Sequence, residues 1–332
     1  MTSNTSRIRN VALSALALLI GLESPAAVEV VRFTAQPADL PATGPVSVID
    51  PRHAWVGLTY TSDAGESWAA RVPSPKDAAR FADNPPYGQT TVFITAERGW
   101  LSGLDSVWMT DDGGLTWQPQ LHGRIGGLAL IGKAGWIVAG DSHSSWNYTT
   151  TDSGQNWSRC GPPWDYSLVG PFGSASFIDA QTGWMTVTNY DRIGRPLVGG
   201  VARTADGGCK WDIVWRDTVH PADNLTGIQF VDKDYGWLTA SYSRLLQTSD
   251  GGSHWHSVAL PSVLIESSYL VSKTRGWILG GSDTGSGLYY TSDGGKQWIS
   301  VSETDLRENQ GMAQEIPPSW GAAFLMRLHL RR

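Results

Sequence analysis

The chain has 332 residues and a formal net charge of −6 at pH 7, with 17% charged residues, 38 glycines and 17 tryptophans. This composition excludes an intrinsically disordered chain and a protein built from long helices. The acidic balance gives no overall electrostatic basis for binding nucleic acid, so we expect no nucleic-acid partner. Frequent glycine and aromatic residues instead favour an all-β fold with many tight turns.

The first 27 residues have the layout of a secretory signal peptide. Arg7 and Arg9 precede a mostly apolar segment, residues 11–22, and small residues follow up to Ala26 and Ala27. The apolar segment is too short for a typical membrane-spanning helix. We expect cleavage after Ala26 or Ala27, with an uncleaved anchor as the alternative. The mature domain, residues 28–332, is then a secreted, periplasmic or extracellular monomer with no transmembrane span.

One eight-residue motif, Ser/Thr-x-Asp-x-Gly-x-x-Trp, recurs six times along the chain. Its copies occupy residues 61–68, 110–117, 150–157, 204–211, 248–255 and 291–298. The motif aspartates are Asp63, Asp112, Asp152, Asp206, Asp250 and Asp293. We expect each carboxylate to accept hydrogen bonds from its own turn, the glycine to supply a backbone conformation that a side chain would block, and the tryptophan to be buried. These aspartates are therefore interpreted as structural residues.

A second tryptophan precedes each motif in a strand-like segment, and five of these six tryptophans follow a glycine. The fifth repeat illustrates the unit, with predicted strands at Thr226–Val231, Trp237–Ser241, Arg244–Thr248 and Trp255–Leu260. Four strands in roughly 40 to 50 residues is the period of a propeller blade. The sequence thus predicts an all-β, single-domain β-propeller with clear repeats over residues 46–301.

The number of blades is left open by the two ends of the chain. Six motifs predict six blades, and the strand-like segments Val28–Phe33 and Phe324–Arg331 would give a seventh if they complete another blade and close the ring. The tail, residues 302–332, has no clear repeat. The first repeat has only a short interval from Trp55 to Asp63, which suggests that this blade lacks a strand.

The motif and its Gly-Trp partner resemble those of the bacterial neuraminidase repeat, or Asp-box, propellers of the sialidase superfamily. The even repetition is most similar to that of the photosystem II assembly factor-like proteins. The resemblance covers roughly residues 46–301. It implies that the Asp-box turns join the third and fourth strands of each blade, away from any active site. It identifies a fold and not a function.

Cys160 and Cys209 are the two cysteines of the chain and lie in consecutive repeats. Export to an oxidising compartment favours a disulfide between them, and two independent thiols are the alternative.

A binding site is expected on the rim opposite the Asp boxes, where loops between blades and between second and third strands gather. The candidate binding residues in these loops are Trp146, Trp164, Asp165, Tyr166, Tyr190, Asp191, Arg192, Arg195, Tyr242 and Arg244. No metal site and no cofactor are predicted, because the histidines show no convincing metal-ligand spacing and no phosphate-binding glycine loop is present.

Some of the loop residues would also suit two kinds of glycosidase. Arg192, Arg195 and Arg244 would suit the carboxylate-binding arginines of a sialidase-like enzyme, but the Phe/Tyr-Arg-Ile-Pro segment of sialidases is missing. Asp165 and Asp191 would be the acid and base of a xyloglucanase-like enzyme, whose relatives have a much longer chain. No catalytic set is assembled by the sequence.

We therefore predict an exported, non-catalytic propeller that binds a protein or peptide, or an envelope carbohydrate polymer, through its loop-rich rim. An assembly or stability factor is one form of this function, and a glycoside hydrolase is the alternative.

Overall fold

The computed structural model describes most of residues 52–302, without residues 57–58, 64–66, 72–89, 103–105, 141–144, 165–173, 191–195, 222, 242, 262 and 283–284. It also describes residues 13–18, 30–35 and 46–48, and residues 304, 305, 309, 311, 312 and 315.

The described chain forms six four-stranded antiparallel sheets, each made of four consecutive strands. We call them blades 1 to 6 in chain order. Blade 1 contains β3 (Val46–Val48), β4 (Ala54–Val56), β5 (Thr59–Thr61) and β6 (Ala69–Ala70). Blade 2 contains β7 (Thr90–Phe93), β8 (Gly99–Ser102), β9 (Ser106–Thr110) and β10 (Gln118–His122). Blade 3 contains β11 (Arg124–Ile131), β12 (Ala134–Gly140), β13 (Ser145–Thr150) and β14 (Ser158–Trp164).

The second half of the chain repeats this unit three more times. Blade 4 contains β15 (Ala175–Phe177), β16 (Gly183–Tyr190), β17 (Pro196–Thr204) and β18 (Asp212–Arg216). Blade 5 contains β19 (Leu225–Phe230), β20 (Gly236–Ala240), β21 (Arg244–Thr248) and β22 (His256–Val258). Blade 6 contains β23 (Leu264–Leu270), β24 (Gly276–Ser282), β25 (Gly285–Thr291) and β26 (Ile299–Val301).

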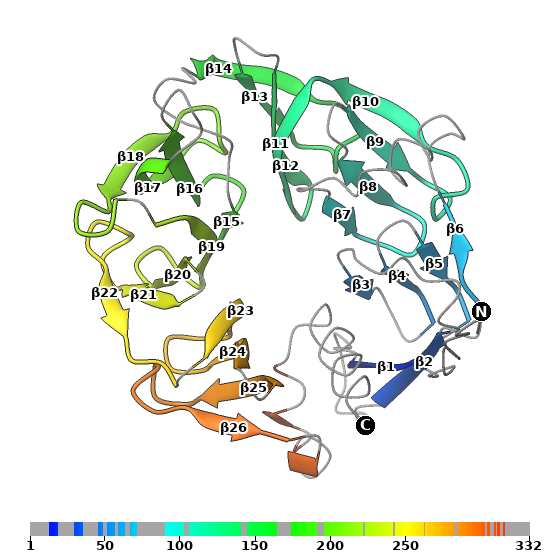
Figure 1. The fold of residues 1–332 in the computed structure, drawn as a ribbon. Coiled ribbons are helices and arrows are strands. Elements are labelled where there is room, and N and C mark those ends of the chain that lie inside the picture. Colours follow the sequence, from blue (N-terminus) through cyan, green and yellow to red (C-terminus); the bar gives the residue numbers. More distant parts are fainter. Residues whose placement is uncertain are drawn as a thin grey trace, which may run out of the picture.

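The blades are arranged in a ring, as predicted for a β-propeller (Figure 1). A two-stranded sheet of β1 (Leu13–Leu18) and β2 (Val30–Ala35) lies between blade 6 and blade 1 (Figure 1). β1 falls inside the segment predicted to be a signal peptide, and β2 overlaps the leftover segment Val28–Phe33. The other leftover segment, Phe324–Arg331, lies outside the described residues. The choice between six and seven blades stays a prediction.

The strand assignment from the repeats agrees closely with the structure in blade 5, where every predicted strand has a counterpart within two residues at either end. The expectation for blade 1 was wrong, because this blade has all four strands. Only residues 57 and 58 separate β4 from β5, and β6 has two residues. The first repeat is therefore short because its strands and its hairpin are short, and no strand is missing.

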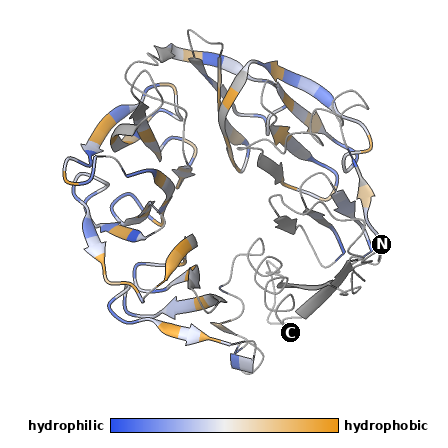
Figure 2. Ribbon diagram, viewed as in Figure 1, coloured by the Kyte–Doolittle hydropathy of each residue, from blue (hydrophilic) through white to orange (hydrophobic). Residues whose placement is uncertain are grey.

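The second strand of each blade carries a buried tryptophan, which in blades 1 to 5 lies at the joint with the next blade. Six such tryptophans, Trp55, Trp100, Trp136, Trp184, Trp237 and Trp277, are at most 1% exposed. The outer strands β10 and β18 each carry both hydrophobic and hydrophilic residues (Figure 2). This mixture is typical of a strand with one face towards the core and one towards solvent. The second-strand tryptophans are therefore core residues, as the repeat pattern indicates. Of the box tryptophans only Trp211 is buried, and the expectation of burial was wrong for the other five, which are partly exposed.

The Asp box of one blade packs against this tryptophan of the preceding blade. In blade 3, Gly154 has a φ of 72°, and a Cβ added to it would lie 2.7 Å from the Trp100 ring. Between blades 4 and 5, Trp184 stacks on Phe230 with ring centroids 3.7 Å apart and donates its indole N–H to the Gly251 carbonyl at 2.8 Å. The boxes are thus joints between blades as well as turns within one blade.

The indole N–H groups of the buried second-strand tryptophans are not all hydrogen bonded. Trp184 has an acceptor, whereas the Nε1 atoms of Trp55 and Trp100 have none among the described residues.

Candidate functional site

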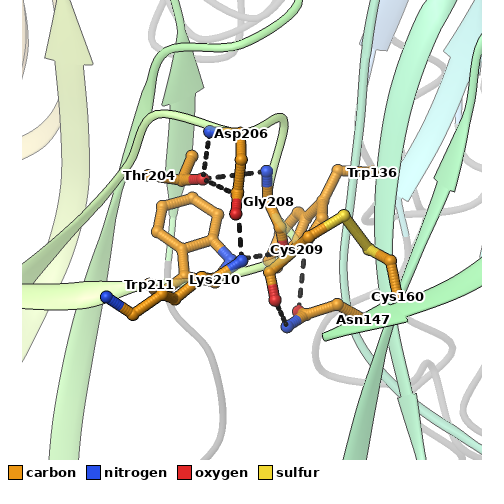
Figure 3. Close-up of a disulfide and its surroundings, with 9 residues drawn as sticks. All are labelled: Trp136, Asn147, Cys160, Thr204, Asp206, Gly208, Cys209, Lys210 and Trp211. Carbon is orange, nitrogen blue, oxygen red and sulfur yellow. Dashed lines mark hydrogen bonds between the residues drawn. A yellow bond between two sulfur atoms is a disulfide. The ribbon is translucent and has the colours of Figure 1, made fainter. Parts of the chain in front are cut away.

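The Asp boxes share one hydrogen-bond network, and it fixes their carboxylates as structural groups. In the box of blade 4, Thr204 Oγ1 donates to Asp206 Oδ1 at 2.9 Å, and the Lys210 amide donates to the same oxygen at 2.9 Å (Figure 3). The Gly208 amide donates back to Thr204 Oγ1 at 2.9 Å. One carboxylate oxygen of Asp206 is therefore bound twice inside its own turn.

These hydrogen bonds stabilise the ionised carboxylates. The side-chain hydroxyl and backbone amide of Ser67 lower the pKa of Asp63 to about 2, and the side chain and amide of Asn156 do the same for Asp152. Burial opposes the shift at Asp250, but hydrogen bonds from His254 prevail and its pKa is also about 2. A carboxylate with so low a pKa cannot act as a general acid near neutral pH.

The box of blade 4 also carries the covalent link of the molecule. Cys209 in this box is joined by a disulfide to Cys160 in β14 of blade 3, with Cα atoms 5.0 Å apart (Figure 3). Beside it, Trp136 donates to Asn147 Oδ1 at 3.1 Å, and Asn147 Nδ2 donates to the Cys209 carbonyl at 3.4 Å. Of the two alternatives that the sequence left open, the structure has the disulfide.

The opposite rim is the predicted binding face, and part of its candidate set can be placed. Arg244 begins β21 in blade 5 and Trp146 lies in β13 of blade 3. Trp164 ends β14 and Tyr190 ends β16, and of these two the structure describes the backbone. Asp165, Tyr166, Asp191, Arg192, Arg195 and Tyr242 lie outside the described residues. The convergence of arginines that a sialidase-like site demands therefore stays a prediction.

Arg244 is held by two carboxylates from the link between blades 4 and 5. Its Nη1 donates to Asp217 Oδ2 at 3.1 Å and also to Asp223 Oδ2. The Asp217 side chain is 3% exposed, while Arg244 and Asp223 are 21% and 23% exposed. We call Asp217, Asp223 and Arg244 the rim ion cluster.

Asp217 organises the link that follows β18. Its Oδ1 accepts the amides of Val219 and His220 at 3.2 and 2.9 Å, and its own amide donates to the Gly199 carbonyl at 2.9 Å. The Asp217 carboxylate thus accepts hydrogen bonds from the turn through Oδ1 and binds Arg244 through Oδ2. Because both oxygens have partners, the carboxylate is tolerated in a buried position. Asp217 is not among the candidate residues predicted from the sequence. A polar residue directly after a strand end is a common turn signal, and nothing in the sequence showed its burial.

The rim ion cluster supports an exposed apolar side chain. Val219 is 78% exposed, and the neighbouring His220 side chain is 50% exposed with Nδ1 3.9 Å from Asp217 Oδ1. In the adjoining blade, Leu264 at the start of β23 is 61% exposed on the same rim. A rigid link with projecting apolar groups is suited to docking another molecule.

Trp146 has a different environment from the one that sugar stacking requires. The guanidinium carbon of Arg159 lies 2.7 Å from the centroid of its ring, so one face of the indole is covered by a cation. This contact is a cation–π interaction within blade 3. One ring face is therefore unavailable to a stacked sugar.

The described residues offer neither a metal site nor a membrane-spanning helix. In that part of the chain, no group of three or more His, Cys, Asp or Glu side chains is arranged to hold a metal ion. The described segments also contain no helix that is long and apolar enough to span a membrane.

The ring of four-stranded blades joined by Asp boxes defines the chain as an Asp-box β-propeller. Residues 207–309 match the family model described as photosynthesis system II assembly factor YCF48. The predicted resemblance to this group of repeat propellers is thereby confirmed. A comparison with curated protein sequences finds no significant match.

Solved structures with the same fold include two described as YCF48. YCF48 bound to D1 peptide is 20% identical with a TM-score of 0.55, and the match covers 81% of this chain and 83% of that one. YCF48 from Cyanidioschyzon merolae is 19% identical with a TM-score of 0.54, over 80% of this chain and 87% of that one. The GH74 xyloglucanase from Xanthomonas campestris is 14% identical with a TM-score of 0.54, over 89% of this chain and 46% of that one. At these identities the likeness establishes the fold.

Proposed function

We propose that the chain is an exported, non-catalytic propeller that binds a protein or peptide through the rim opposite its Asp boxes and serves as an assembly or stability factor. The observation that carries this proposal is the rim ion cluster. Its arginine is neutralised by two carboxylates of the same chain, so Arg244 is occupied and is not a free ligand for a substrate carboxylate. The cluster instead makes the link with Val219 rigid.

Pre-organisation is the physical reason why such a link favours binding. A loop that is already ordered loses little conformational entropy when a partner docks, and exposed Val219 supplies apolar area to bury. The similar YCF48 propeller whose structure holds a D1 peptide supports a peptide as the ligand class. It does not identify the peptide that this chain binds.

The test uses immobilised residues 28–332 with proteins extracted from the envelope of the producing cell. We expect Val219→Asp to lose a specifically retained protein, because the substitution places a charge in the apolar contact. Leu115→Asp is the matched control, since Leu115 is 70% exposed in the Asp box of blade 2 on the other rim. Equal retention by the wild type and both variants would overturn the proposed docking face.

A glycoside hydrolase is the alternative, and the GH74 likeness is the observation in its favour. That likeness is one of fold, and it covers under half of the xyloglucanase chain. Hydrolysis of a sialyl or glucan substrate that is abolished by Arg192→Ala or Asp191→Asn would replace the binding proposal with this one.

A further inference from the structure

The C-terminal tail contacts blade 6 after the end of β26. Of the tail residues that the structure describes, Met312 and Glu315 are partly buried, whereas residues 302, 304, 305, 309 and 311 are exposed. We call Met312 and Glu315 the tail anchor. Since a terminal segment is ordered where it is tied to the rest of a domain, the contacts of these two side chains decide how the tail is held.

Local hydrogen bonds lead the tail from the end of β26 to its anchor. The amide and hydroxyl of Ser302 donate to Asp305 Oδ2 at 2.7 and 2.6 Å, and the Asp305 amide donates to Ser302 Oγ at 3.2 Å. The Asp305 carbonyl accepts the Asn309 amide at 2.9 Å. Asn309 Oδ1 accepts the Met312 amide at 3.1 Å, and the Met312 carbonyl accepts the Glu315 amide at 3.2 Å. The tail is therefore a series of capped turns.

Met312 makes the apolar contact of the tail anchor. It packs against the buried cluster of blade 6, which consists of Trp277, Leu279, Leu288, Tyr290 and Val301. Within this cluster the rings of Tyr290 and Trp277 have centroids 4.6 Å apart. A flexible thioether side chain suits such an uneven apolar surface.

Glu315 supplies a counter-charge that the box of blade 6 lacks. Arg275 stands directly before the Gly-Trp pair of blade 6, as Arg98 does in blade 2. Arg98 pairs with Asp111 in the Asp box of its own blade. The corresponding box residue of blade 6 is Ser292, which carries no charge. Arg275 Nη1 donates instead to Glu315 Oε1, and the Glu315 side chain is 16% exposed.

The apolar and ionic contacts of the tail anchor lie side by side. Tyr290 belongs to the cluster that Met312 contacts, and burial together with the nearby Glu315 carboxylate raises the pKa of its hydroxyl. The Arg275 side chain is 48% exposed, and an ion pair with so exposed a partner is weak by itself, so the apolar contact is needed to hold the tail.

We propose that the tail anchor latches the C-terminal tail onto blade 6. The receiving surface, an arginine beside an apolar cluster, fits a segment with an apolar residue and an acidic residue three positions apart, which the tail provides as Met312 and Glu315. This latch is separate from the rim ion cluster and does not rest on binding at the opposite rim.

Hydrogen–deuterium exchange of the full chain, read by mass spectrometry, tests the latch. Residues 309–315 contain the hydrogen-bonded amides of the anchor, and we expect them to exchange at least about tenfold more slowly than an isolated peptide of the same sequence. Arg275→Glu and Met312→Asp should each remove most of this protection. The charge swap Arg275→Glu/Glu315→Arg should restore it to within about twofold of the wild type, because the ion pair is rebuilt with its signs exchanged.

Two controls separate release of the tail from general unfolding. Arg98→Glu makes the same change at the corresponding position of blade 2 and should leave the tail protected. Exchange of β16 in blade 4 shows that each variant keeps its fold. If Arg275→Glu exposes β16, then Glu315→Gln makes the test from the tail side, where the loss of one charge should still speed the exchange of residues 309–315.

The proposal is overturned if residues 309–315 of the wild type exchange as fast as the isolated peptide. It is also overturned if the folded anchor variants exchange like the wild type, or if Arg98→Glu releases the tail as much as they do. A charge swap that leaves the tail as unprotected as Arg275→Glu alone would refute the pairing of Arg275 with Glu315.

Discussion

Removing the arginine of the rim ion cluster should strongly destabilise the protein. In Arg244→Ala, the Asp217 carboxylate stays 3% exposed and loses its counter-charge. Breaking a buried pair in this way costs about 3–5 kcal/mol of unfolding free energy. We expect a value near the lower limit, about 3 kcal/mol, because Arg244 is 21% exposed and two backbone amides still bind Asp217.

The neighbouring substitutions give the reasoning its internal check. Asp223→Ala should cost about 1 kcal/mol, because Asp223 is more exposed and Arg244 keeps Asp217. In the double variant Asp217→Asn/Arg244→Met the buried position 217 carries no charge, and only the partly exposed Asp223 loses its partner, so the cost should fall below the sum of the single costs by about 1–3 kcal/mol. Arg98→Ala breaks an ion pair with Asp111 whose side chains are 31% and 46% exposed, and it should cost less than about 1 kcal/mol.

Urea unfolding followed by tryptophan fluorescence measures these differences, because tryptophans line the joints between blades. The order expected is Arg244→Ala, then Asp223→Ala, then Arg98→Ala. An Arg244→Ala cost no larger than that of Arg98→Ala would refute the view that the buried carboxylate depends on Arg244. Strict additivity in the double variant would refute the coupling.

Three further outcomes are expected. Replacing both cysteines by serine removes a cross-link between residues 49 apart, which the chain-entropy model equates with about 4 kcal/mol of unfolding free energy; an unchanged urea midpoint under oxidising conditions would contradict a formed disulfide. The folded pKa values of Asp63, Asp152 and Asp250 are about 2, below the ordinary value of 3.8, so their stabilisation is complete above pH 5 and lost as the pH falls through 4 towards 2. The melting temperature should therefore drop over that range, and drop less in Asp250→Asn. Gly208→Ala, at a φ of 94° against the Trp136 ring, should lower the melting temperature more than Gly132→Ala, at a φ of 59° with open space around it; equal shifts would show that packing against the tryptophan contributes nothing.

The fold could be predicted from the sequence because its information is local and repeated. An Asp box is complete within eight residues, and its carboxylate, hydroxyl and glycine interact with one another whatever surrounds them. The tryptophan before each box then marks the second strand. Four strands per repeat favour a propeller, and the six second-strand tryptophans are at most 1% exposed in it.

The details of the rims required the tertiary structure. Asp217 and Arg244 are 27 residues apart, and Gln247 lies across a joint from Lys296. Each residue alone is an ordinary polar residue near a strand, because side-chain burial and pairing between blades depend on which turns the ring brings together. The motif predicted from the sequence as a turn likewise proved to be a joint, since Gly154 contacts a tryptophan of the preceding blade.

The sequence by itself determined the repeating unit, the strand order within each blade and the residues of the box turns, because all of these depend on interactions between near neighbours in the chain. The tertiary structure alone decided that Asp217 and Asp223 neutralise Arg244, and that a groove of about 490 Å³ opens between blades 5 and 6. These features depend on distances between blades, and no local pattern encodes such distances.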